Sequence, residues 1–194
     1  MAISYPLALP STAAVRRIRP RARNAAAVSE SPLTFASQVH LWPGQAWQFD
    51  VTLRRMARSE AEDWVAFMLS LNGRAGTFLL GDPSSRAPRG SATSAQITGA
   101  AESSSVTVSM TGTLMRGDYL QIGSGSDATL HKVLVERSGS GTLEIWPALR
   151  KARSAAVVTL MSPVGLFRLA SNEVTWDIDQ FRNYDVTFGA TEAV

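Results

Sequence analysis

Residues 58–83 read RSEAEDWVAFMLSLNGRAGTFLLGDP and predict a helix followed by a turn and a strand. Ser59 is a candidate N-cap, and Glu62 stands three residues later, which is the spacing of a capping box. The apolar residues recur at helical spacing and form one stripe that can face a core; they are Trp64, Phe67, Met68 and Leu71. These residue types favour packing over chemistry.

The segments on either side of this helix are predicted strands. In QAWQFDVTL, residues 45–53, every second residue is apolar, as is typical of a half-buried strand; these residues are Trp47, Phe49, Val51 and Leu53. Asn72 and Gly73 end the helix, because glycine takes the left-handed conformation without steric cost. The short run TFLL follows and stops at Gly81-Asp82-Pro83. The unit is therefore a strand, a helix and a strand.

The composition changes after Pro83. The stretch SSRAPRGSATSAQITGAAESSS is rich in Ser, Ala and Gly and is interpreted as a loop or linker. Five short strands with Gly-rich turns follow, in VTVSM, DYLQIG, LHKVLVE, TLEIWPAL and AVVTLM. This spacing is typical of a small antiparallel barrel or sandwich, which includes OB-like arrangements.

The last part of the chain, in VGLFRLA, EVTWDID and NYDVTFGA, alternates aromatic and polar residues as the first part does. We expect these strands to return and complete the first sheet. The predicted fold class is mainly β with one α-helix. A β-sandwich or split barrel would comprise residues 1–87 and 161–194, and a small OB-like barrel at 88–160 would be inserted in it.

The totals exclude several kinds of site. The chain of 194 residues has no cysteine and two histidines, so disulfides, Cys-ligated metals and His-rich centres are not expected. His40 and His131 are interpreted as structural or surface residues. No G-x-S-x-G elbow is present, and we predict no catalytic, cofactor or metal site and no enzyme activity.

Two local motifs invite a chemical interpretation. GSGSDATLHK is Gly-rich and ends at Lys132, but it lacks the phosphate-loop spacing and no helix pattern follows it, so it predicts a hairpin turn. WDID places Asp177 and Asp179 on one face of a strand, where carboxylates can act as acid and base or bind a cation. Surface acids on an edge strand are the favoured interpretation, and an arginine of a neighbouring copy is a possible partner for them.

A basic cluster and one tryptophan are the candidate interface residues. The cluster has five arginines in eight residues, and the first acid after it is Glu30; the arginines are Arg16, Arg17, Arg19, Arg21 and Arg23. Such a cluster can meet phosphates or an acidic protein face, and the favoured interpretation is a solvated arm that orders in an assembly. Trp42, beside Pro43-Gly44, is predicted on a turn, where it would be either an anchor for a partner or a core residue.

The N-terminal segment MAISYPLALPSTAAVRRIRPRAR is not typical of a secretory signal, because its basic residues follow its apolar stretch. No apolar run reaches the roughly 18–20 residues of a membrane span. The expectation is synthesis in the cytoplasm without export and no membrane partner.

The run QVHLWPGQAWQFDVTLRRMARSEAEDWVAFMLSLNGRAGTFLLGDP, with the closing WDID and YDVTF, resembles the distal tail proteins of long-tailed bacteriophages and prophages. The resemblance covers residues 38–83 and 164–190. It implies a β-structured belt domain with one helix, six copies of which close into a ring at the tail tip of the virion. The implied partners are further copies of the chain, the tail tube protein, the baseplate hub protein and the tape-measure protein, with DNA passing through the lumen. The family has no catalytic residues to transfer.

Two other functions stay open from the sequence. One is a different tail part of related fold, such as a tube or tube-completion protein. The other is an OB-type nucleic-acid-binding protein, suggested by the middle region and the arginines. Only Tyr119 and Trp146 are aromatic between residues 88 and 160, whereas OB folds bind single strands by stacking bases on aromatic side chains.

Overall fold

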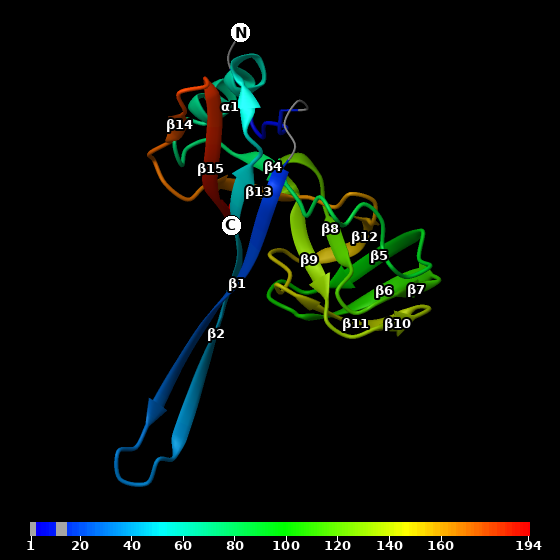
Figure 1. Ribbon diagram of the computed structural model, residues 1–194. Coiled ribbons are helices and arrows are strands. Elements are labelled where there is room, and N and C mark those ends of the chain that lie inside the picture. Colours follow the sequence, from blue (N-terminus) through cyan, green and yellow to red (C-terminus); the bar gives the residue numbers. More distant parts are fainter. Residues whose placement is uncertain (1–2, 11–14) are drawn as a thin grey trace.

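Figure 1 shows the computed structural model, which describes residues 3–10 and 15–194. Strands account for 51% of the chain, and the described residues contain one α-helix, a large antiparallel sheet and a closed six-stranded barrel. The predicted fold class, mainly β with one helix, is confirmed.

The large sheet has the order β1-β2-β15-β13-β4, and the short strands β3 and β14 pair with β15. It combines segments from both ends of the chain, as the alternating pattern of the closing segments predicted. The bounds are β1 Val15–Glu30, β2 Ser37–Leu53, β3 Met56–Ala57, β4 Phe78–Leu80, β13 Gly165–Leu169, β14 Trp176–Ile178 and β15 Asn183–Glu192.

The core of this sheet is the predicted one. The four apolar residues at alternate positions of β2 are at most 4% exposed; they are Trp47, Phe49, Val51 and Leu53. The helix α1, Arg58–Ser70, packs its apolar stripe in the same cluster, where the Trp64 ring lies 5.9 Å from Phe188 and the Phe67 ring 5.6 Å from Phe78. Large aromatic side chains in contact account for much of the stability of such a core.

The two ends of the helix differ in how well they were predicted. Asn72 and Gly73 have φ angles of 48° and 63°, so the left-handed end is confirmed. The capping box is wrong: the N-cap is Ala57, which makes no side-chain cap, and Ser59 lies in the first turn. The chain enters the helix directly from β3, and the Glu62 carboxylate accepts a hydrogen bond from Arg58 instead.

The barrel lies between β4 and β13 in the chain and has the closed order β11-β6-β5-β12-β8-β9. Its strands are β5 Ser94–Gly99, β6 Ser105–Thr111, β8 Tyr119–Ile122, β9 Thr129–Val133, β11 Gly141–Trp146 and β12 Arg153–Thr159. A short ribbon of β7 Thr113–Leu114 and β10 Arg137–Ser138 adjoins it, and the 3-10 turn η1 Gly125–Asp127 connects β8 to β9.

Strand β5 corrects the prediction of a linker at this point. Its small residues alternate as a strand requires: Ala95 and Ile97 are buried, whereas Ser94, Gln96 and Thr98 are exposed. Alanine and serine are poor signals of a strand, so the alternation was hidden by composition. The barrel therefore closes with six strands where five were predicted.

Candidate functional site

Strands β1 and β2 continue beyond the sheet as a two-stranded projection (Figure 1), which we call the arm and define as residues 25–44. The chain reverses between Ser31 and Ala36, where the Ser31 amide donates to the Ala36 carbonyl at 2.9 Å. Phe35 takes a φ of 55° at this reversal. At about 3.3 Å per residue the arm reaches roughly 20 Å from the last pair at its root.

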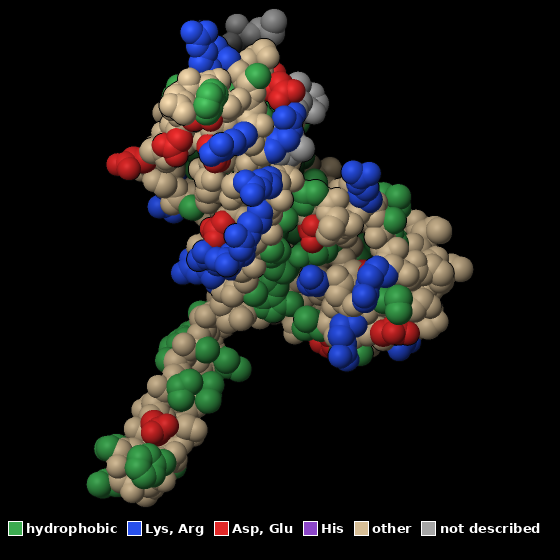
Figure 2. Space-filling model, in the orientation of Figure 1, with side chains coloured by type: hydrophobic (Ala, Val, Ile, Leu, Met, Phe, Trp, Pro, Cys, Tyr) green, Lys and Arg blue, Asp and Glu red, His purple; other side chains and the backbone are tan. Residues whose placement is uncertain are grey.

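The surface of the arm is apolar and almost uncharged, with Glu30 as its single charged residue (Figure 2). Every residue of the arm except Ser31 is exposed. Six large apolar side chains between 55% and 89% exposed lie here, namely Val28, Leu33, Phe35, Val39, Leu41 and Trp42. Exposed apolar side chains gathered on one element mark a surface for a partner.

Trp42 is exposed, but the prediction that it lies on a turn is wrong. It belongs to β2, and the chain does not reverse there. Between the pairs Asn24–Gln45 and Ala26–Leu41, strand β2 contains two more residues than β1, so Trp42 and its neighbours form a bulge. Pro43 has no amide to donate to a ladder, which explains why a proline–glycine pair is tolerated at this irregularity. The Trp42 ring lies 5.8 Å from that of His40.

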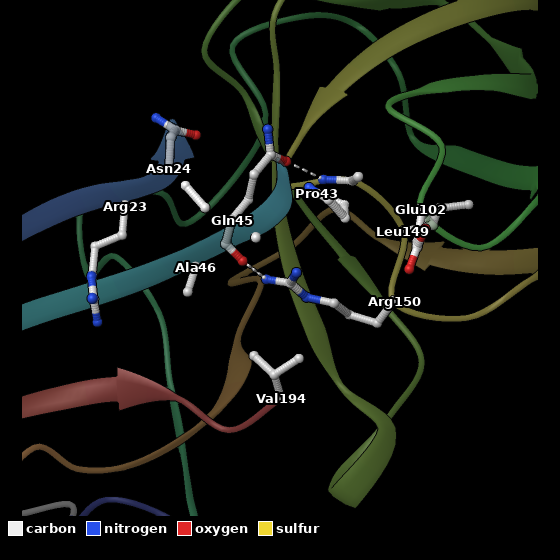
Figure 3. A pocket seen from close by; sticks show the side chains of 12 residues that line it. Arg23, Asn24, Pro43, Gln45, Ala46, Glu102, Leu149, Arg150 and Val194 are labelled. Carbon is white, nitrogen blue, oxygen red and sulfur yellow. Dashed lines mark hydrogen bonds between the residues drawn. The ribbon is translucent and has the colours of Figure 1, made fainter. Parts of the chain in front are cut away.

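The root of the arm is fastened to the barrel by side chains. Arg150 donates to the Gln45 carbonyl at 2.6 Å and to the Glu192 carboxylate at 2.7 Å, and the Gln45 side chain accepts from the Ala148 amide at 2.8 Å. Figure 3 shows the two contacts of Gln45 beside a hollow of about 570 Å³. The Arg150 and Glu192 side chains are 15% and 5% exposed, so this ion pair is buried.

The five arginines do not form a separate segment that waits for an assembly to order it, which corrects that part of the prediction, although their side chains are exposed. All five arginines belong to β1, which pairs with β2 over its length. Arg16 lies in a register shift, and the other four follow at every second position; we call them the arginine ladder, namely Arg17, Arg19, Arg21 and Arg23. All five are exposed. The Arg21 guanidinium pairs with Asp50.

The two acids of the WDID motif do not share a strand face. Asp177 is exposed on β14, whereas Asp179 follows the end of that strand and closes a turn. The Asp179 carboxylate accepts from the amides of Phe181 and Asn183, both at 2.8 Å. Hydrogen bonds from Asn183 chiefly lower the pKa of Asp179, with a smaller effect from Arg55 at 3.8 Å. Asp179 is therefore a turn residue within its own chain.

The Gly-rich motif forms the predicted hairpin turn between β8 and β9. Lys132 lies over the Tyr119 ring at 4.2 Å and is not placed to bind a phosphate at the turn. Asp127 pairs with Arg153 and Lys151, and their hydrogen bonds lower the pKa of its carboxyl. Burial raises the pKa of Tyr119 to about 12.

His131 is fully buried, and its ring nitrogens lie 2.8 Å from the Pro147 carbonyl and 2.9 Å from the Thr129 hydroxyl. Burial lowers its pKa to about 4, so the ring is neutral and structural. No group of three or more His, Cys, Asp or Glu is placed to hold a metal ion in the described residues.

The aromatic residues of the barrel are occupied by contacts within the chain. Tyr119 is 4% exposed. The half-buried Trp146 donates to the Asn24 side chain at 2.8 Å, and its ring meets Trp47 edge to face. Neither ring is presented as a platform on which a base can stack.

Comparison with protein-family models gave no match, and comparison with curated proteins gave none either. Among the described residues, none of the helices has the length and apolar character that crossing a membrane requires.

Sequence reasoning missed the arm as an element. Five of its six large apolar residues were not among the candidates, and only Trp42 was. The available signal lay in two short runs, residues 24–29 and 37–42. They contain no Asp, Glu, Lys or Arg, and each contains one valine, a residue favoured in strands.

Proposed function

We propose that this chain is a structural subunit of the tail tip of a long-tailed bacteriophage, where copies close into a ring, with six expected, that joins the tail tube to the baseplate hub. The observation that carries the proposal is the arm. A two-stranded hairpin standing alone in water is marginally stable, so an arm with six exposed apolar side chains is best explained by a second chain that covers it.

The open edge of the sheet supports a ring. Within the described residues β1 pairs only with β2, so its outer edge offers unpaired backbone groups. Cyclic rings need two different patches on each subunit that meet head to tail. The exposed edge of β1 within the sheet and the projecting arm are two different patches of this kind. The resemblance of residues 38–83 and 164–190 to distal tail proteins points in the same direction.

A tube or tube-completion protein is the alternative that the same geometry allows, and the position of the chain in the virion distinguishes them. The arrangement does not favour single-strand recognition by the barrel, because Tyr119 and Trp146 are engaged within the chain.

An arm-shortened variant tests the proposal. Asn24 and Gln45 are paired, so replacing residues 25–44 by Asn-Gly leaves a two-residue hairpin of favoured type. We expect electron microscopy to show rings for the full chain at high concentration, and single particles for the variant with an unchanged circular dichroism spectrum. Single particles for both proteins would overturn the proposal.

A further inference from the structure

The arginine ladder lies on a sheet face that has no other assigned role. The buried residues of β2 pair with Val15, Ile18, Pro20 and Ala22 of β1, so the ladder faces the opposite way. Its partners on β2 are Ala46, Gln48, Asp50 and Thr52, and the next column, on β15, is Thr187, Gly189 and Thr191. Where these three strands pair within the sheet, the face is therefore polar and free of aromatic side chains.

The charge of this face is strongly unbalanced. On β1 and β2, four guanidinium groups stand against one carboxylate, that of Asp50, which pairs with Arg21. Asp185 continues the β15 column beyond Thr187, and its carboxylate lies 3.9 Å from Arg55. Among the described residues no acid lies within ion-pair distance of Arg17, Arg19 or Arg23. Figure 2 shows Lys and Arg side chains gathered along the part of β1 that lies within the sheet. Unpaired cations held in a row raise the local concentration of anions.

The spacing of the ladder matches an extended polyanion. Alternate residues of a strand lie about 6.6 Å apart, so the four arginines span about 20 Å, the axial length of about six base pairs of duplex DNA. Arginine binds phosphate through a planar, bidentate fork. We propose that the ladder binds the phosphate backbone of double-stranded DNA without reading its sequence.

The composition of the face favours nucleic acid over an acidic protein. The central part of a protein–protein interface is depleted in charge and rich in aromatic residues, and the arm has that character whereas the ladder face does not. Single strands are held by stacking on aromatic side chains, which this face lacks, so duplex is the preferred ligand. The inference goes beyond the proposed ring, because an isolated chain already carries the ladder.

Fluorescence anisotropy of a short labelled DNA duplex, measured between about 50 and about 200 mM salt, tests the inference on the full chain. The test variant is Arg17→Gln/Arg19→Gln/Arg23→Gln. The matched control, Arg58→Gln/Arg116→Gln/Arg182→Gln, removes three exposed arginines outside the ladder face. The test variant is expected to bind about tenfold more weakly or worse, with a salt slope less steep by about 2.7, whereas the control keeps the slope of the unmodified protein.

A lysine variant and a light-scattering measurement complete the test. The variant Arg17→Lys/Arg19→Lys/Arg23→Lys keeps the charge and is expected to keep the salt slope, which reports on the face even if the glutamine variant folds poorly. Equal losses in the test and control variants, no duplex binding, or equal affinity for polyglutamate would overturn the inference. Light scattering on the same samples separates it from the ring, because a monomer that binds through the ladder supports the ladder alone.

Discussion

Arg150 and Glu192 form the buried ion pair at the root of the arm, and Glu192 also accepts from the Trp47 amide at 2.9 Å. Removing one partner of such a pair leaves the other charge buried without compensation. The pair therefore links the barrel, the last residues of β15 and the start of the arm.

Replacing Arg150 with alanine should lower the free energy of unfolding by about 3 kcal/mol, measured by urea denaturation. Arg58 is the matched control, because it forms an ion pair with Glu62 that is largely exposed. Arg58→Ala should cost less than about 1 kcal/mol. Equal costs for the two variants would show that the root pair does not fasten the arm.

His131 makes the stability of the protein depend on pH. Its pKa falls from the ordinary 6.5 to about 4 in the folded chain because of burial, with smaller contributions from Arg150 and Arg153. The unfolded chain therefore binds the proton first as the pH falls. This contribution to stability is complete above 6.5 and is lost progressively towards 4, about 3 kcal/mol in all.

Urea denaturation at a series of pH values between 6.5 and 4 measures this loss. In His131→Gln, which does not titrate, the pH dependence in this window should be much smaller, although the variant is less stable throughout. Asp127 and Asp179 have lowered pKa values and lose their contributions below this window. An unchanged pH dependence in the variant would contradict the assignment.

At the scale of elements, the sheet and the helix were largely predictable from sequence. Strand β2 carries buried aromatic residues at every second position, and α1 carries a stripe at helical spacing. In both, one buried face imposes a period on the sequence. The closing strands were recognised in the same way.

The arm and β5 were not predictable by this route. Both faces of the arm are exposed, so burial imposes no alternation, and Pro43-Gly44 suggests a turn where the structure has a bulge. The arginines of the ladder recur at strand spacing. The residues between them on β1, which face the core side, are Ile18, Pro20 and Ala22, and this short set gives a weak apolar alternation. The arm therefore leaves no alternating pattern in the sequence, and the ladder is visible there only as alternating arginines.

The start of helix α1 lacks a capping side chain. Ala57 occupies the N-cap without a side-chain hydrogen bond, so Ala57→Ser should stabilise the protein by about 0.5–1 kcal/mol. Ser59→Ala should change stability by much less, because Ser59 is not the cap. Thermal denaturation of the two variants compares them directly. A loss of about 1 kcal/mol in the free energy of unfolding for Ser59→Ala would show that Ser59 caps the helix after all.

The whole molecule combines a helix-covered sheet, a barrel inserted between β4 and β13, and an arm that reaches away from both (Figure 1). No group of three or more His, Cys, Asp or Glu in the described part of the chain is placed to hold a metal ion, and the polar groups at the root of the arm hold elements together. The exposed surface of the described residues includes an apolar arm, an open strand edge and a basic sheet face.

Ring formation is measured by the mass of the full chain in solution, determined by light scattering over a concentration series. We expect a species of about six times the 20.8 kDa chain mass, whose share grows with concentration. This species should be lost when residues 25–44 are replaced by Asn-Gly. A mass of one chain at every concentration would show that the chain does not form rings on its own.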